Sequence, residues 1–224
     1  MNTKIRNYML CTPVVALITK PHPNKLLYIG ANTHLAPVRH FPNTKEFVFI
    51  DTQPRSEFDK ENIFETCFYR HRFYKRLLRT LSQYGFILLS TTVLDKQYVK
   101  THYQHCNPTL LYFSNPVTRQ TVKYYISTNI LYNMCPVLEQ DIRQTDGLII
   151  SGYHPHQKVL DYLPKSITWY CYNSTCYSYD EYNPDTIIGT LHRENMIGTF
   201  IVMDYHSGKQ LCACDTIQEV SYIT

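Results

Sequence analysis

The amino-acid sequence predicts an α/β fold with a mostly parallel sheet and helices on both of its faces. Two short apolar runs, ending at Gly30 and Asp51, are bounded by turn residues, which is the pattern of buried parallel strands. About 20 residues separate the two ends, enough for a short crossover helix. The chain has 224 residues, 44% of them hydrophobic, so we expect a single domain over residues 1–224.

The chain is predicted to open with a lead-in and a strand-helix-strand unit. Residues 1–24 form the lead-in and end in two prolines, which prevent a regular helix there. Residues 33–41 are expected to hold a brief helix, since Pro37 is tolerated only in its first turn. The loops after the two strands, 30–34 and 51–53, then lie at the edge of the sheet where such sheets bind ligands.

Residues 68–84 have the pattern of an amphipathic helix. The apolar face carries Phe73, Leu77, Leu78, Leu81 and Tyr84, and the other face carries Arg72, Lys75, Arg76 and Arg79. The basic face is either a solvated surface of a helix that covers the sheet, which we favour, or a nucleic-acid-binding surface. Gly85 ends the helix, and Phe86–Thr92 is predicted to be a third buried strand.

Residues 95–128 do not fit a simple crossover connection. Two strand-like runs, 109–113 and 121–126, are separated by a segment that contains the turn signal Asn115-Pro116. We predict a β-hairpin inserted into the α/β framework. Such an insertion shapes a substrate pocket, provides an oligomer contact or merely decorates the domain.

The second half of the chain continues the alternation of helices and strands. A helical pattern with a break at Pro136 spans residues 129–144, and an Asp-Gly turn leads into a fourth strand at 148–150. The remaining predicted elements are a short helix at 157–163, a fifth strand at 167–172, and a closing antiparallel hairpin formed by 200–204 and 210–214.

The stretch LLYIGANTH at residues 26–34, followed by Asp51, resembles the first two motifs of the class I S-adenosylmethionine-dependent methyltransferases. In that family a glycine-rich loop follows the first strand, and an acidic residue at the end of the second binds the ribose hydroxyls. The resemblance implies a Rossmann-like, methyltransferase-type fold with a C-terminal antiparallel hairpin, and S-adenosylmethionine as the cofactor. The cofactor-binding residues that it implies are Gly30, Ala31, Asn32, Thr33, Asp51, Thr52 and Gln53.

The loop departs from the family motif at three positions. Tyr28 stands where an acidic residue is usual, and Asn32 and His34 stand where further glycines are usual. Asn tolerates a left-handed backbone better than most residues, so Asn32 can still make the turn.

The loop after the fourth predicted strand commonly carries catalytic groups in this family. Here it contains Tyr153 and His154, which can stack on a planar acceptor or hydrogen-bond to it, and they are the candidate catalytic residues. The Asn/Asp-Pro-Pro-Tyr motif of amino-methylating enzymes is missing, which argues against methylation of a base nitrogen. The acceptor is unidentified. A net charge of +4 keeps nucleic acid among the candidate partners.

Two other functions compete with methyl transfer. The first is a catalytically inactive methyltransferase-like scaffold or interaction protein that keeps the sheet and has lost the cofactor loop. The second is a nicotinamide-dependent oxidoreductase, which we disfavour because Asn32 occupies the second glycine position of GxGxxG and Pro37 follows soon after. The sequence contains neither a GxxxxGK[ST] phosphate loop nor a GxSxG elbow, which argues against nucleotide hydrolases and serine hydrolases.

The cysteines and histidines indicate no metal site. The eight cysteines form no CxxC pair, and the groups His102/His105/Cys106 and His154/His156 lack further ligands at suitable spacing. We found no secretory signal and no apolar run long enough for a membrane span, so we expect reduced thiols and a cytoplasmic location. With 20 tyrosines and only 7 glycines, the composition is typical of AT-rich genomes, and we expect a viral protein in the host cytoplasm.

Overall fold

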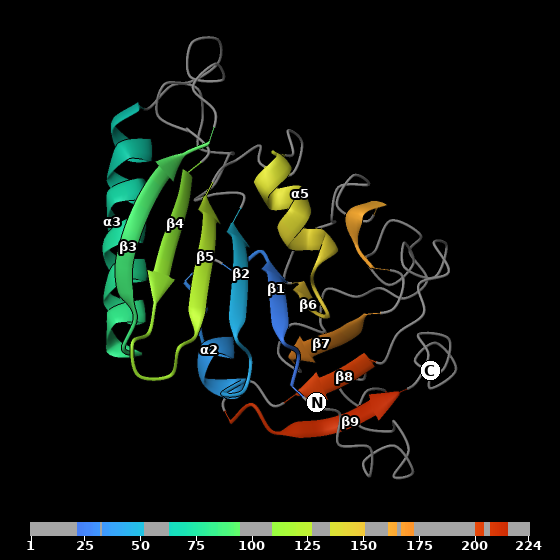
Figure 1. Cartoon of the computed structure of the whole chain (residues 1–224). Helices are drawn as coiled ribbons and strands as arrows, with labels where there is room; N and C mark the ends of the chain where they lie inside the picture. Colours follow the sequence, from blue (N-terminus) through green and yellow to red (C-terminus); the bar gives the residue numbers. More distant parts are fainter. Residues whose placement is uncertain are drawn as a thin grey trace, which may run out of the picture.

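The computed structural model describes residues 22–31, 33–51, 63–94, 109–126, 135–150, 161–164, 167–172, 200–203 and 207–214. In these residues nine strands form one mixed sheet in the order β3-β4-β5-β2-β1-β6-β7-β8-β9 (Figure 1). The elements, in chain order, are β1 (Lys25–Ile29), α2 (Pro37–His40), β2 (Glu46–Asp51), α3 (Ile63–Gln83), β3 (Ile87–Val93), β4 (Thr109–Ser114), β5 (Thr121–Ile126), α5 (Pro136–Arg143), β6 (Gly147–Ile150), β7 (Thr168–Tyr172), β8 (Phe200–Met203) and β9 (Gln210–Cys214). The predicted α/β class is confirmed.

Parallel strands make up the centre of the sheet. The strands β5, β2, β1, β6, β7 and β8 are neighbours in that order and run parallel. Antiparallel pairing is confined to the two ends, where β4 lies between β3 and β5, and β9 pairs with β8. The chain order reverses at β1, because β2 lies on one side of it and β6 on the other. In open α/β sheets, ligands bind outside the carboxyl ends of the strands at such a reversal.

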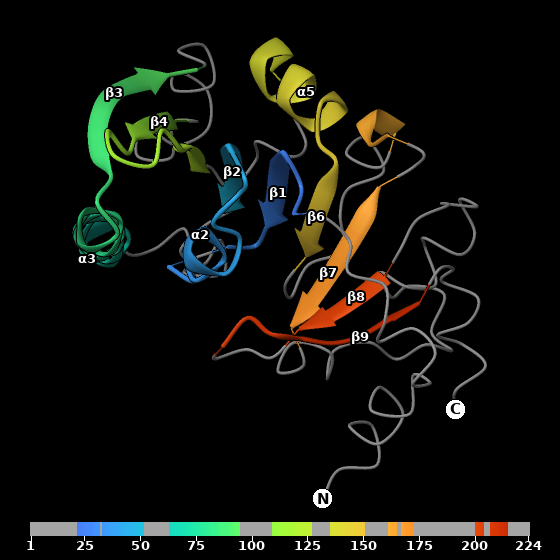
Figure 2. The same ribbon diagram turned by 60° about the horizontal axis from the view of Figure 1, so that its bottom comes forward.

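Helices cover both faces of the sheet, as predicted. Figure 2 shows α2 and α3 on one face and α5 on the opposite face. The α2/α3 face is apolar and aromatic, and its buried cluster includes Tyr28, Phe47, Phe49, Phe113 and Tyr124. Parallel strands buried on both faces are near-continuous apolar runs, which is why β1 and β2 could be located from sequence.

The helix α3 follows the predicted amphipathic pattern and begins five residues earlier than expected, at Ile63. Phe73, Leu77 and Leu81 are buried against the sheet. The helix ends just before Gly85, whose φ of +83° is a left-handed conformation that costs glycine little. The amide of Phe86 then donates to the carbonyl of Leu81 at 2.9 Å, which satisfies one of the last carbonyls of the helix.

The prediction that Phe86–Thr92 is a buried core strand is wrong. The segment forms β3, which lies at the end of the sheet, and all seven of its residues are exposed. The hairpin predicted within residues 95–128 is confirmed for β4 and β5, but it is no accessory insertion. Its second strand, β5, pairs with β2 in parallel and occupies the position expected for Phe86–Thr92. The apolar run correctly indicated a strand. The position of that strand in the sheet depends on pairing with residues far away in the sequence, which the run itself does not indicate.

The smaller elements agree with the predictions where the structure describes them. The helix α2 is one turn long, with Pro37 in its first turn, and α5 begins at Pro136, the predicted break. The closing hairpin is formed by β8 and β9. The predictions for residues 1–21, 129–134 and 157–160 lie outside the described residues.

Candidate functional site

The loop that follows β1 turns at Gly30, which has a φ of +76°. Only glycine adopts this left-handed conformation freely, which explains the residue at this position. The backbone amides of Gly30 and Ala31 both donate to the carbonyl of Ile50, at 2.8 and 3.3 Å. These two hydrogen bonds therefore attach the loop to the carboxyl end of β2, beside Asp51.

Asp51 is the last residue of β2, and only 3% of it is exposed. It lies opposite Ile126 in the parallel register with β5, so its side chain is on the α2/α3 face. There the Tyr124 hydroxyl donates to Asp51 Oδ2 at 3.4 Å. Burial, and then the negative charge of Asp51, raises the pKa of Tyr124 well above its ordinary value, so Tyr124 remains a donor at neutral pH.

Two of the positions at which the loop departs from the methyltransferase motif are in contact. The Tyr28 hydroxyl and His34 Nδ1 lie 2.9 Å apart, and the two rings meet edge to face at 5.8 Å between centroids. A tyrosine in place of an acid and a histidine in place of a glycine thus form one hydrogen-bonded pair. With Asp51 and Tyr124, they make up what we call the carboxyl-end cluster.

Burial, reinforced by the positive charge of His40, lowers the pKa of His34 to about 4. His34 is therefore neutral at physiological pH, and its ring can accept one hydrogen bond and donate another. The neutral His34 ring, the hydroxyls of Tyr28 and Tyr124, and the Asp51 side chain offer donors and acceptors suited to a polar ligand.

The lowered pKa of His34 predicts a pH dependence of stability. Because the unfolded chain takes up this proton near pH 6.5 and the folded chain only near pH 4, stability should be full above pH 6.5 and decline as pH falls toward 4. A shift of this size corresponds to about 3 kcal/mol, and we expect a loss on the order of 2 kcal/mol because His34 is partly exposed and solvent screens the interaction. Urea unfolding at several pH values should show the decline in this window, and His34→Gln should reduce it. An unchanged decline in the variant would contradict the assignment.

The structure describes four of the residues predicted from sequence, Gly30, Ala31, Thr33 and Asp51, and it brings Gly30 and Ala31 to the end of β2 beside Asp51. The others, Asn32, Thr52, Gln53, Tyr153 and His154, lie outside the described residues. Sequence reasoning missed Tyr124 altogether. The signal that would have located it is the parallel pairing of β5 with β2, which local sequence does not reveal.

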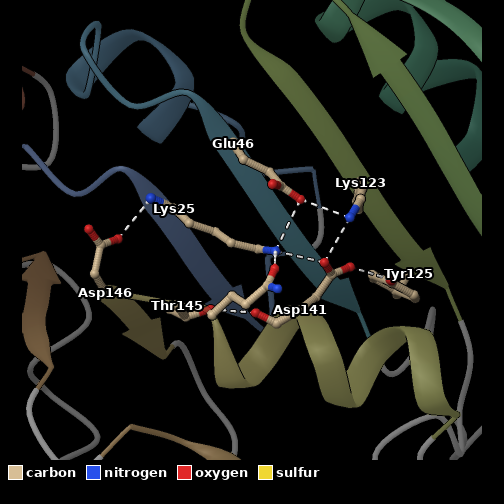
Figure 3. Close-up of polar contacts among 8 residues, drawn as sticks. Lys25, Glu46, Lys123, Tyr125, Asp141, Thr145 and Asp146 are labelled. Carbon is tan, nitrogen blue, oxygen red and sulfur yellow. Dashed lines mark hydrogen bonds and ion pairs between the residues drawn. The ribbon is translucent and has the colours of Figure 1, made fainter.

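A second polar cluster lies beneath α5, on the opposite face of the sheet (Figure 3). Lys25 Nζ and Lys123 Nζ each lie 2.7 Å from Asp141 Oδ1, and Tyr125 donates to Asp141 Oδ2 at 2.5 Å. Glu46 completes it with ion pairs of 3.2 Å to Lys25 and 2.9 Å to Lys123. These five residues, which we call the α5 network, are contributed by three strands and one helix.

The α5 network is balanced in charge, with two ammonium groups and two carboxylates. Burial alone would raise the pKa of Asp141, but hydrogen bonds from Lys123, Lys25 and Tyr125 outweigh it and the pKa is lowered. Burial alone would lower the pKa of Lys123, but Asp141 and Glu46 outweigh it and the pKa is raised. Mutually satisfied charges of this kind fix α5 on the sheet rather than offering a ligand site.

A third set of contacts joins the amino end of β1 to the residue before β6. The Asp146 carboxylate accepts hydrogen bonds from the backbone amides of Asn24 and Lys25, at 2.8 and 2.7 Å. Asp146 immediately precedes β6, so these bonds hold β6 in register with β1. The contact lies at the amino end of the strands, away from the carboxyl-end cluster.

Within the described ranges, no three His, Cys, Asp or Glu side chains are grouped so that they could hold a metal ion. In the same part of the chain, no helix has both the length and the apolar character needed to cross a membrane.

No protein-family model, curated protein or solved structure matches this chain.

Proposed function

We propose that this chain binds an adenosine-containing cofactor at the carboxyl ends of β1 and β2, and that the cofactor is S-adenosylmethionine. The observation that carries the proposal is the pairing of a left-handed glycine after β1 with a carboxylate at the end of β2. Both lie beside the reversal of strand order at β1. A glycine turn and an acidic residue in these places are the features with which doubly wound sheets hold the ribose and phosphate parts of nucleotides.

The order of the central strands supports the same class of ligand. Numbered among themselves, the parallel strands β5-β2-β1-β6-β7-β8 have the order 3-2-1-4-5-6, which is the order of the dinucleotide-binding doubly wound fold. Fold alone does not determine function, so the ligand proposal depends on Gly30 and Asp51. The resemblance of residues 26–34 to the methyltransferase loop selects S-adenosylmethionine from the adenosine-containing cofactors.

The described residues fit such a cofactor in two respects. Gly30 provides a turn without a side chain, and Asp51 provides a carboxylate that Tyr124 holds from one side. We propose that residues 30–33 and 51–53 hold the cofactor, which supplies an electrophilic methyl group when bound. Tyr153 and His154 are proposed to orient the acceptor and to take up its proton.

The acceptor is an oxygen or nitrogen nucleophile of unidentified structure, and nucleic acid remains a candidate. We propose a cytoplasmic site of action, because the eight cysteines show no spacing typical of a disulfide framework. A viral origin is proposed on composition alone.

Replacing Asp51 with alanine is expected to weaken cofactor binding by roughly 1.5 to 3 kcal/mol, because charge-assisted hydrogen bonds to two ribose hydroxyls are lost. The measurement is calorimetric titration of wild type and variant with S-adenosylmethionine, S-adenosylhomocysteine and NAD. Glu139→Ala, which removes a partly exposed carboxylate on α5, is the control and should bind as wild type does. Circular dichroism of each variant checks that the fold is retained.

Three results would count against the proposal. Equal affinity of wild type and Asp51→Ala removes Asp51 from the site. Tight binding of NAD alone would mean that the site binds a nicotinamide cofactor. No binding of any of the three favours an inactive scaffold.

The scaffold is the second candidate function, and a specific observation favours it. The amides of Gly30 and Ala31 are both committed to Ile50, and Tyr28 and His34 contact each other beside them. A loop closed in this way keeps the sheet intact whether or not a cofactor binds. A protein of this kind would act through its surface.

A further inference from the structure

The edge strand β3 has few of the usual protections against pairing. Its register with β4 shifts between Leu88 and Ser90, and an irregularity of this kind is one such protection. All seven of its residues are exposed, with Ile87 at 56% and Leu89 at 59%. It contains no charged residue and no proline, although natural edge strands commonly carry one or the other. In the described part of the chain no strand pairs with its outer side, so backbone donors and acceptors are presented there.

Both faces of β3 offer apolar side chains. Residues directly opposite each other in a sheet point to the same face, so the register with β4 assigns each side chain. Leu88 lies opposite Phe113 and therefore points to the α3 side, whereas Ile87 lies opposite Ser114 and points to the other side. A strand added to β3 would find apolar contacts on either face.

The helix beside this edge is strongly basic. Figures 1 and 2 both show α3 alongside β3 at the same end of the sheet, and the two elements are in contact. Arg72, Lys75, Arg76 and Arg79 have i, i+3, i+4 and i+7 spacing, so they form one stripe about 10 Å long on the exposed side of the helix.

The part of α3 that carries this stripe has no acidic residue of its own. Residues 72–83 contain four basic residues and no acidic residue. No side chain on this part of α3 is therefore a carboxylate. In the described ranges, the ion pairs of the protein involve the α5 network and the Glu139–Arg143 pair, and none includes Lys75, Arg76 or Arg79.

We infer that β3 and α3 together form a docking edge for an extended, acidic segment of a partner protein. The segment adds to β3 as a further strand, and its main chain pairs with the open side of β3. Its alternate apolar side chains lie on the same side of the sheet as Ile87, and its carboxylates point to the α3 side, where Leu88 and Val93 lie. Its carboxylates meet the basic stripe of α3. This interaction is independent of the cofactor site at the carboxyl ends of β1 and β2.

Charge complementarity selects this partner over the two other occupants of such an edge. If a second copy paired antiparallel with β3, the two-fold axis would bring two basic α3 helices to the same face of the joined sheet, where they repel. A nucleic acid would satisfy the basic stripe but would leave the uncharged, apolar strand without a role. An acidic strand uses both features.

The test uses the full-length protein and a labelled eight-residue peptide that alternates glutamate with valine or isoleucine, with binding measured by fluorescence anisotropy. Two further peptides serve as probes: one has N-methyl groups on alternate residues, and the other has lysine in place of glutamate. Each should bind at least about tenfold more weakly, because one lacks backbone donors and the other has the wrong charge.

A matched pair of protein variants locates the peptide. Val93→Glu should weaken binding by at least about tenfold, since it places a carboxylate on the edge. Val137→Glu is the control, because Val137 on α5 is also a partly exposed valine, at 45% against 40% for Val93, and should bind as wild type does. A Lys75→Glu/Arg76→Glu/Arg79→Glu variant should also lose at least about tenfold and lose most of the salt dependence.

Several outcomes would overturn the inference. No binding of the glutamate peptide, or equal binding of its N-methylated form, rejects strand addition. A dimer that sediments in a concentration-dependent way and is abolished by Val93→Glu assigns the edge to a second copy. Binding of a single-stranded oligonucleotide that depends on the basic stripe, without binding of the peptide, assigns α3 to nucleic acid.

Discussion

Replacing Asp141 with alanine is expected to lower the free energy of unfolding by roughly 3 to 5 kcal/mol. The carboxylate is almost fully buried and contacts three partners, Lys25, Lys123 and Tyr125. Its removal leaves the Lys25 ammonium buried with only Glu46 for charge compensation. Losing one partner of a buried network costs far more than losing an exposed ion pair.

The same helix provides the control for this measurement. Glu139 and Arg143 form an exposed i, i+4 pair on α5, with 3.0 Å between Glu139 Oε1 and Arg143 Nη2. Glu139→Ala should therefore change the free energy of unfolding by only about 0.5 kcal/mol. Urea unfolding of both variants measures the contrast. Equal effects at the two positions would mean that Asp141 is not buried among these partners.

The second large effect is expected at Leu77, where alanine should cost roughly 2 to 5 kcal/mol. Leu77 is fully buried where α3 packs on the sheet, so the substitution removes apolar contacts and leaves a cavity. Leu78 is the next residue on the same helix and is 37% exposed, so Leu78→Ala should cost about 1 kcal/mol or less. Chemical denaturation of the two variants compares the same substitution in the same helix. A larger loss at Leu78 would mean that α3 packs on the sheet with a different side from the one described above.

The sequence was sufficient to locate elements whose pattern is local. The runs before Gly30 and Asp51 are apolar throughout because their strands are covered on both faces, and the spacing of Phe73, Leu77 and Leu81 follows the helical repeat. Glycines at the left-handed positions 30 and 85 marked the ends of a strand and a helix.

Elements defined by distant partners could not be located in the same way. The run 87–93 has the composition of a buried strand, yet its place at the edge follows from the pairing of β5 with β2. Lys25 and Asp141 are 116 positions apart, and nothing near either residue indicates the other. Tyr124 was missed for the same reason, because its contact with Asp51 requires the register of two strands 73 positions apart.

The bonds from Asp146 to the backbone of Asn24 and Lys25 have a consequence for the way this protein is made. They span 122 and 121 positions, so β1 emerges from the ribosome long before the residues that pair with its second side. At ordinary rates of synthesis, roughly 6 to 24 seconds separate the two events. During that interval β1, β2 and β5 can already associate, while β1 still has an open edge and Lys25 still lacks Asp141. Within the described residues, the nascent chain then has two unpaired edges, at β3 and at β1, and the edge at β1 closes only when β6 has been made.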